Sequence, residues 1–209
     1  MNIVNYDFEY KEQLKKNISL VREDIESASS ILKIKNFCEK YNYSYESVVE
    51  KILGDDMFAV FFAKEPSKQN IYEKIAAKYV ESLDSVSSFE NYPNSIKLFV
   101  INGNITNKRE NDVKSIDFHI KVGNISIYAS HKYIKDSKGG GSQDNQYNEV
   151  RNFLRNCNKL NTGDVYYIAI CDGAYFDSKI GILNHDFGSS HVRAMPINEL
   201  EGFINSIKV

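Results

Sequence analysis

The sequence contains few of the features that mark membrane, secreted or disulfide-rich proteins. No apolar run in the 209 residues approaches the length of a transmembrane helix. The first residues lack the basic and apolar regions of a secretory signal peptide. There are only three cysteines, and Cys38, Cys157 and Cys171 all fall inside helix or strand patterns. We therefore expect a cytoplasmic protein with no membrane partner, whose cysteines are reduced thiols of the core.

Two ligand-binding patterns are also missing. His185 and His191 lack partners with the spacing of zinc ligands, which argues against a zinc site. The glycines at residues 139–141 are not followed by Lys-Ser or Lys-Thr, so they do not form a nucleotide-binding loop. Acidic, basic and amide side chains therefore remain as the candidates for a functional site.

The net charge of −2 does not by itself indicate a nucleic-acid-binding protein. Its distribution is uneven, because basic residues outnumber acidic ones between residues 108 and 138. A locally positive surface that keeps some acids suits phosphate contact beside a metal ion, although a solvated charged surface is the alternative. The basic residues of this stretch are Lys108, Arg109, Lys114, Lys121, Lys132, Lys135 and Lys138, and the acidic ones are Glu110, Asp112, Asp117 and Asp136.

The first part of the chain reads as helical. Apolar residues recur at three- and four-residue steps through residues 7–53, and Ser44 is a suitable N-cap for the last of these helices. We therefore expect an N-terminal helical region over residues 1–63, followed by the main core over residues 64–209. The length is compatible with one compact domain that carries such an extension.

Strand patterns dominate the second part of the chain. A helix that begins near Pro66 precedes three candidate strands, which Asn-Gly and Gly-Asn turns separate. Ser142 is a suitable N-cap for the next helix, and a buried strand and an amphipathic helix follow. The strands are expected at residues 96–101, 113–120, 125–133 and 165–171, and the last helix at 198–207. The predicted fold class is α/β (α+β), with a mixed sheet in the order helix, three strands, helix, strand.

Asp117 and Lys132 lie on consecutive predicted strands. Because strand side chains alternate between faces, Lys132 shares a face with Ser130, whereas His131 points to the opposite face. We therefore expect His131 to pack or to form hydrogen bonds. A carboxylate and an ammonium on adjacent strands could hold a metal ion and a scissile phosphate at one edge of a sheet. A surface ion pair is the alternative interpretation.

Three stretches of the chain resemble the PD-(D/E)xK nuclease superfamily, and within it the type II restriction endonucleases. They are residues 64–73 (KEPSKQNIYE), 132–147 (KYIKDSKGGGSQDNQY) and 167–176 (YIAICDGAYF). The resemblance covers the chain from Lys64 to its C-terminal end. It also rests on the order of elements, with an acid on the second strand and a lysine on the third. It implies a restriction-endonuclease-like core over residues 64–209.

The resemblance implies roles for individual residues. Asp117 corresponds to the metal-binding acid, and Lys132 to the lysine that orients or activates the attacking water. The acid expected two residues before that lysine is absent, because Ser130 stands there. Some restriction enzymes with serine at this position recruit a later glutamate, so Glu149 becomes a candidate metal ligand and catalytic residue. Glu73 corresponds to a glutamate on the first core helix that touches the metal through water.

Polar residues around the start of the following helix complete the candidate site. Gln143, four residues before Tyr147, matches a glutamine–tyrosine pattern of related nucleases, which implies a catalytic role. Helix N-termini attract anions and amides can pair with adenine, so this region is also a candidate DNA contact. The alternatives are ordinary polar residues at a helix start, and solvated acids in the case of Glu73 and Glu149. The candidate DNA-binding residues are Lys135, Lys138, Ser142, Asn145 and Gln146.

These roles imply a site-specific endonuclease that hydrolyses double-stranded DNA. Mg²⁺ is the expected cofactor because it prefers oxygen ligands and can activate water. A homodimer is expected because palindromic sites match two-fold symmetry, with dimer or DNA contacts from residues 1–63. The functional partner would be a cognate DNA methyltransferase. The alternatives are a structure-specific or repair nuclease of the same superfamily, and a catalytically silent DNA-binding protein on this fold.

Overall fold

The computed structural model describes residues 3–92, 96–109, 113–135, 140–159 and 163–207. It divides the chain into two compact units, one formed by Asn5–Tyr72 and the other by Glu73–Val209 with Met1–Val4. The boundary lies between Tyr72 and Glu73, whereas the sequence placed it between residues 63 and 64. Every helix in the described ranges is too short or too polar to cross a membrane.

The first unit is helical, as the apolar spacing predicts. Ser44 accepts a hydrogen bond from the backbone N–H of Ser47 at 3.3 Å and so acts as the predicted N-cap. Its core contains the fully buried side chains of Ile34, Val48 and Ile52. The elements of this unit are α1 (Tyr6–Glu23), α2 (Ala28–Tyr41), α3 (Tyr45–Gly54), α4 (Asp56–Ala59) and the 3₁₀ helix η1 (Pro66–Gln69), and α5 (Ile71–Glu81) leads into the second unit.

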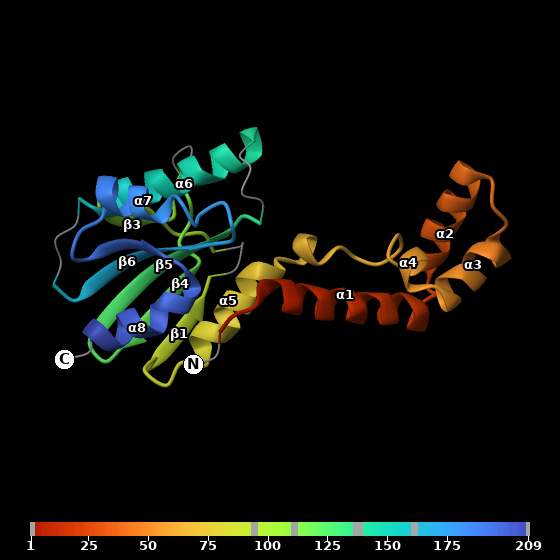
Figure 1. Ribbon diagram of the computed structural model, residues 1–209, viewed down its shortest axis with the longest axis horizontal. Coiled ribbons are helices and arrows are strands. Elements are labelled where there is room, and N and C mark those ends of the chain that lie inside the picture. Colours follow the sequence, from red (N-terminus) through yellow and green to blue (C-terminus); the bar gives the residue numbers. More distant parts are fainter. Residues whose placement is uncertain (1–2, 93–95, 110–112, 136–139, 160–162, 208–209) are drawn as a thin grey trace. The chain divides into compact units, whose positions relative to one another are not determined.

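The second unit is built on a mixed five-stranded sheet with the order β1-β4-β5-β6-β7. β4 pairs antiparallel with β5, and β5, β6 and β7 are parallel neighbours (Figure 1). The chain therefore has the mixed α and β composition expected from its sequence. The elements are β1 (Ser88–Asn91), β2 (Phe99–Ile101), β3 (Asn104–Thr106), β4 (Phe118–Val122), β5 (Ile125–Tyr133), α6 (Gly141–Cys157), β6 (Val165–Asp172), α7 (Ile180–Phe187), β7 (Val192–Met195) and α8 (Ile197–Ile207).

The first predicted strand does not join the main sheet. Residues 96–101 instead contribute β2, which forms a separate two-stranded sheet with β3. The reason is local, because Asn102 and Gly103 adopt positive φ values of 48° and 84° and turn the chain back immediately. The edge of the main sheet beside β4 is taken by β1, a short, mostly exposed strand without a clear apolar pattern. The expected order of helix, three strands, helix and strand is found in the main sheet, but its first strand is β1 and not residues 96–101.

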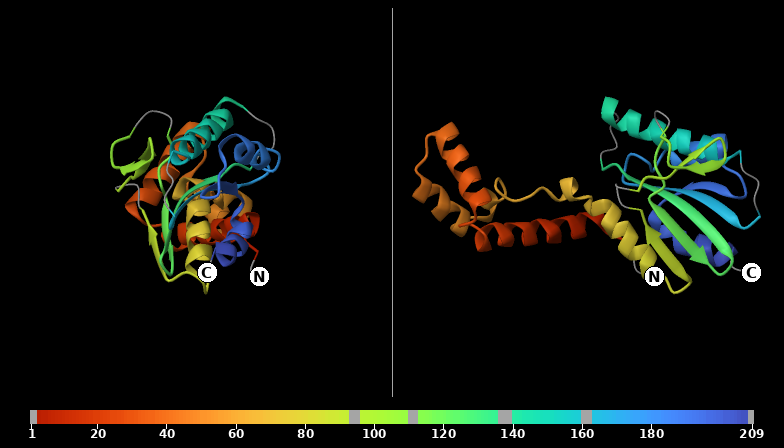
Figure 2. Two further views of the ribbon diagram at one scale, coloured as in Figure 1. Left: turned by 90° about the vertical axis from the view of Figure 1, so that its left-hand side faces the viewer. Right: turned by 180° about the vertical axis from the view of Figure 1, so that it is seen from behind.

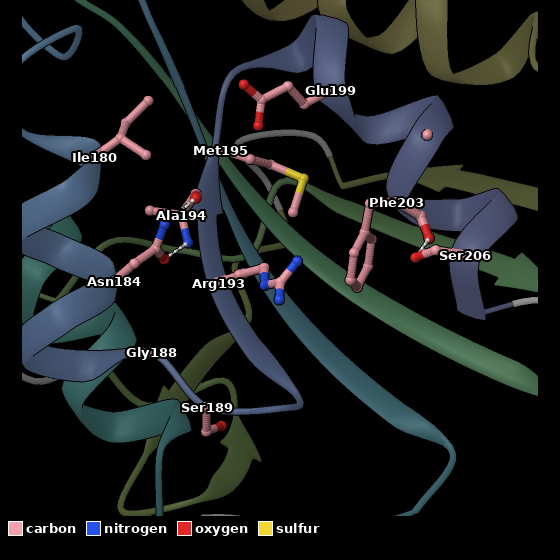
Figure 3. Close-up of a pocket in the computed structure, with 11 residues that line it drawn as sticks. Ile180, Asn184, Gly188, Ser189, Arg193, Ala194, Met195, Glu199, Phe203 and Ser206 are labelled. Atoms are coloured by element: carbon pink, nitrogen blue, oxygen red, sulfur yellow. Dashed lines mark hydrogen bonds between the residues drawn. The ribbon is translucent and has the colours of Figure 1, made fainter.

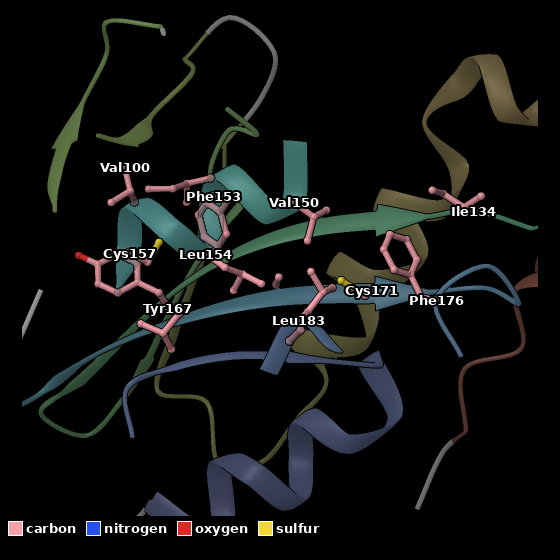
Figure 4. Packing of buried hydrophobic residues seen from close by; sticks show 14 of the residues in the cluster. Val100, Ile134, Val150, Phe153, Leu154, Cys157, Tyr167, Cys171, Phe176 and Leu183 are labelled. Carbon is pink, nitrogen blue, oxygen red and sulfur yellow. The ribbon is translucent and has the colours of Figure 1, made fainter. Parts of the chain in front are cut away.

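Helices cover both faces of the main sheet. α6 and α7 pack on one face and α8 on the other, as Figures 1 and 2 show from different sides. Under α6, the buried residues Val150, Phe153 and Leu154 contact the sheet (Figure 4). Cys157 and Cys171 lie buried in this cluster, and all three cysteines are free thiols, as predicted. The apolar stripe of α6 thereby fixes which of its side chains face the sheet and which face outward.

Candidate functional site

One polar cavity of about 180 Å³ brings the main candidate residues together. Glu73 comes from α5, Asp117 directly precedes β4, Lys132 lies on β5 and Glu149 lies on α6. These four residues were selected from the sequence as metal-binding or catalytic. The other lining residues are Lys97, Phe99, Arg109, Val113, Lys114 and Ser115. The cavity therefore combines three acidic with four basic side chains among the described residues.

Asp117 is the most strongly held group of this cavity. It is only 5% exposed, and its Oδ2 accepts the backbone N–H of His131 at 2.7 Å. The ammonium of Lys114 lies 2.8 Å from Oδ1 and 2.6 Å from Oδ2, and Ser115 Oγ donates to Oδ1 at 3.3 Å. The backbone N–H of Asp117 donates to the carbonyl of Ala129 on β5. Backbone hydrogen bonds to β5 thus fix the position of this carboxylate, and the ammonium of Lys114 contacts both of its oxygens.

Lys132 and Glu149 face each other across the gap between β5 and α6. Lys132 Nζ lies 3.4 Å from Glu149 Oε2, and the two side chains are 22% and 29% exposed. Burial lowers the pKa of Lys132, and the nearby charge of Lys114 lowers it further, while Glu149 and Asp117 act in the opposite direction. A lysine whose pKa is lowered releases its proton more readily, which suits a group that activates a water molecule.

Glu73 is the third acid of the cavity. Burial raises the pKa of Glu73, and the negative charge of Asp117 raises it further, whereas Lys114, His131 and Lys74 act in the opposite direction. The repulsion shows that Glu73 and Asp117 are electrostatic neighbours. Among the described residues, however, no group of three or more His, Cys, Asp or Glu side chains is placed to hold a metal ion as the side chains stand.

We expect Glu73→Gln to stabilise the folded protein at about pH 8 in the absence of divalent cations. The unfolded glutamate titrates near 4.5 and the folded one at a higher pH, so ionised Glu73 opposes folding once the pH exceeds the folded pKa. The gain should vanish at about pH 3.5, where the carboxyl is protonated in both states. Thermal melts of both proteins at the two pH values measure the difference. An equal change in melting temperature at both pH values would show that burial of the charge is not the cause.

Ser130 does not line the cavity. The side chain is 2% exposed, and its Oγ has no hydrogen-bond partner in the described structure. A carboxylate at this position would be buried without compensation, which is costly. In the structure, Glu149 is the acid that stands beside Lys132.

The predicted residues at the start of α6 lie outside this cavity. Gln143 and Gln146 are half-buried and Ser142 is exposed, and none of the three lines it. Ser142 is also not the N-cap, because the helix begins after Gly140 without a side-chain cap. The hydroxyl of Ser142 instead accepts a hydrogen bond from Gln146 Nε2 at 3.3 Å.

The remaining candidate DNA contacts are distributed differently. Asn145 lines a second groove, which it shares with Glu149. Lys135 is exposed and lies two residues after the end of β5. Lys138 lies outside the described residues.

His131 lies on the opposite face of the sheet from Lys132, as the strand alternation predicts. Its Nε2 is 3.3 Å from Asp172 Oδ2, and both side chains are buried. Asp172 Oδ1 also accepts the backbone N–H of Ile197 at 2.9 Å, at the first residue of α8. Asp172 is the last residue of β6, is buried, and through this bond holds the start of α8 against the sheet.

A larger cavity of about 600 Å³ lies between α7, β7 and α8 (Figure 3). Asn184 donates to the carbonyl of Ala194 at 2.8 Å and accepts its N–H at 2.7 Å, which satisfies the outer edge of β7 there. The guanidinium of Arg193 lies over the ring of Phe203 at 5.6 Å. Of the described residues that line this cavity, only Arg193 and Glu199 are charged. It therefore lacks the set of acids and lysines found around Asp117.

The sequence did not single out two features of the site. Lys114 was noted only as one residue of the basic stretch, and its contact with Asp117 was not predicted. Lys97, in a segment expected to be a sheet strand, joins the cavity because that segment leaves the main sheet. A cation three residues before a candidate metal acid is the signal that could have identified Lys114.

Comparisons with known proteins add little to this description. No family model and no curated protein matches the chain. Among solved structures, the chain is similar to protein VC1899 from Vibrio cholerae, with 10% sequence identity and a TM-score of 0.34. The match covers 100% of this chain and 57% of that protein, so the chain spans less than two thirds of its length. This likeness is too weak to support a shared fold.

Proposed function

We propose that the chain is a Mg²⁺-dependent, site-specific endonuclease of double-stranded DNA, related to the type II restriction endonucleases of the PD-(D/E)xK superfamily. One observation carries the proposal. Asp117 and Lys132, the acid and lysine of the family pattern, line the same cavity as Glu149 and Glu73. These four residues come from separate elements. A simple surface ion pair between Asp117 and Lys132 would not explain why Glu149 and Glu73 line the same cavity.

The donor chemistry of the cavity fits Mg²⁺, which prefers carboxylate oxygens and water. Asp117, Glu149 and Glu73 would hold the ion, directly or through water. The contact of Lys114 with both oxygens of Asp117 supports this assignment, because the carboxylate already has a cation beside it that Mg²⁺ would have to displace. When bound, Mg²⁺ would supply charge neutralisation at the phosphate and a more acidic water molecule.

The basic residues have separate roles in this proposal. Lys132, with its lowered pKa and its contact to Glu149, would orient the attacking water and accept its proton. Lys97 and Arg109 would contact the negative charge of the DNA backbone at the rim of the cavity. The chain's own residues thereby provide both proton transfer and phosphate binding.

A homodimer is part of the proposal, because two-fold symmetry matches cleavage of both strands at a palindromic site. The helical unit has large apolar side chains that are strongly exposed, with Met57 82% and Phe61 74% exposed. A second copy of the chain could cover such side chains. The protein would act in the cytoplasm beside a cognate DNA methyltransferase that protects the same sites.

The decisive experiment is digestion of plasmid and genomic DNA with the purified protein and Mg²⁺. Discrete fragments would support the proposed function, and sequencing their ends would give the recognition site. A smear, or cutting confined to branched substrates, would indicate a structure-specific or repair nuclease. DNA binding without cleavage would indicate a catalytically silent protein. If the protein neither binds nor cleaves DNA, the proposal is wrong.

Glu149→Ala is expected to slow DNA cleavage by about two orders of magnitude, or about 3 kcal/mol of transition-state stabilisation. The substitution removes a metal ligand and the partner of Lys132. Mg²⁺ titration of the cleavage rate measures the effect, and half-saturation should move to higher Mg²⁺. The control is Glu50→Ala, which removes an exposed helix glutamate from α3. A fully active Glu149→Ala protein would leave Glu73 as the second acid.

A further inference from the structure

The outward face of α6 carries a row of amide side chains. Asn145, Asn148 and Asn152 recur at steps of three and four residues, so they share one side of the helix. Arg151 and Arg155 follow one turn apart beside them. Asparagine is a weak helix former, because its amide competes for the backbone hydrogen bonds. Three asparagines in one row therefore oppose helix formation, and a binding role would account for them.

These side chains form a groove that reaches the candidate active site. The three asparagines, the two arginines and Glu149 line a groove of about 460 Å³. Glu149 also lines the cavity that contains Asp117 and Lys132. The groove and the cavity are therefore adjacent at Glu149, so a long ligand in the groove would lie next to the cavity.

The two arginines are held in place before any ligand binds. Arg151 Nη1 donates to Asn148 Oδ1 at 3.4 Å, and Arg155 Nη1 donates to Asn152 Oδ1 at 3.3 Å. Both guanidinium groups also lie over the ring of Phe187, at 5.7 and 5.5 Å from its centre. Side chains that are already ordered lose less conformational entropy on binding. The groove is thus a preorganised surface, positively charged and rich in amides.

We infer that this face of α6 binds duplex DNA next to the scissile phosphate. The arginines neutralise phosphates, and the asparagines reach base edges, where an amide matches adenine. From Asn145 to Asn152 the helix rises about 10 Å, which corresponds to about three base pairs. The inference rests on the proposed nuclease function and names the surface through which that site would meet its substrate.

The first test measures binding without cleavage. Fluorescence anisotropy with a random-sequence duplex of roughly 30 base pairs, about three helical turns, is recorded without divalent cations. Arg151→Ala combined with Arg155→Ala should weaken binding about tenfold or more. The slope of the logarithm of the binding constant against the logarithm of the salt concentration should become shallower by about one per arginine removed. Arg193→Ala, which removes an exposed arginine beside α8, is the matched control and should bind like the wild type.

The second test addresses sequence preference. Asn148→Ala combined with Asn152→Ala should melt no lower than the wild type, because alanine favours the helix. Because Asn148 and Asn152 also accept hydrogen bonds from Arg151 and Arg155, the double variant should bind the random duplex somewhat more weakly than the wild type, but more tightly than the arginine variant. In selection from a random duplex pool, however, it should lose the preference for its site at about two or three positions. A preference identical to that of the wild type would overturn the assignment of the asparagines.

The two proposals can fail separately. If the wild type neither binds the duplex nor cuts plasmid DNA, the proposed function fails. If it cuts plasmid DNA while the arginine and asparagine variants bind and cut normally, only the assignment of this face of α6 is wrong. Stronger binding to single-stranded DNA or to duplex RNA than to duplex DNA would also overturn the inference.

Discussion

Asp117→Asn is expected to abolish DNA cleavage, with a loss of about 1,000-fold or more, or about 4 kcal/mol of transition-state stabilisation. The substitution keeps an oxygen that can accept the N–H of His131 but removes the negative charge that would hold the metal. Asparagine is more informative than alanine, because Asp117 is buried and holds neighbouring groups in place. Single-turnover cleavage with Mg²⁺ measures the loss. Duplex binding without divalent cations should be retained.

The stability of this variant needs its own control. Asp117→Asn leaves the mostly buried ammonium of Lys114 without its partner, which costs about 3 kcal/mol or more. Lys114→Met added to Asp117→Asn removes both charges, so the double variant should recover most of the melting temperature and remain inactive. Asp164→Asn, at an exposed acid of the same unit, should change neither property. Substantial cleavage by the stable double variant would place the active site elsewhere.

Lys132→Met is expected to reduce cleavage by about two to three orders of magnitude, or about 3 to 4 kcal/mol, while DNA binding persists. Methionine fills a similar volume but can neither orient water nor accept a proton. Because the pKa of Lys132 is lowered, the wild-type rate should rise with pH as this lysine loses its proton. The variant should lose that part of the pH–rate profile.

The matched control is Lys121→Met, which removes an exposed lysine from β4. It should cleave like the wild type and show the same rise with pH. If Lys132→Met loses binding and cleavage to the same degree, Lys132 is a phosphate contact and takes no part in proton transfer.

Local features of the fold could be predicted where the sequence contains its own signal. The Gly-Asn turn and the alternating residues after it predicted the β4–β5 hairpin, in which Val122 pairs with Ile125. The helix expected after Ser142 is present as α6, and its apolar residues pack on the sheet. β1 and β7 were not predicted, because short edge strands carry little alternation, and α7 is a helix of only eight residues. The separation of β2 from the main sheet depended on a choice between strand partners, which local pattern does not settle.

For the candidate site, the sequence by itself determined the chemical types and the strand faces. Asp117 lies on one predicted strand and Lys132 on the next, with Ser130 in place of a second acid. The period of two places Lys132 and His131 on opposite faces. Only the tertiary structure decided that Glu149 faces Lys132, that Glu73 repels Asp117 and that Lys114 occupies both oxygens of Asp117. These contacts join different elements or depend on loop conformation. They are set by how α5 and α6 pack against the sheet, which the spacing of residues within one element does not encode.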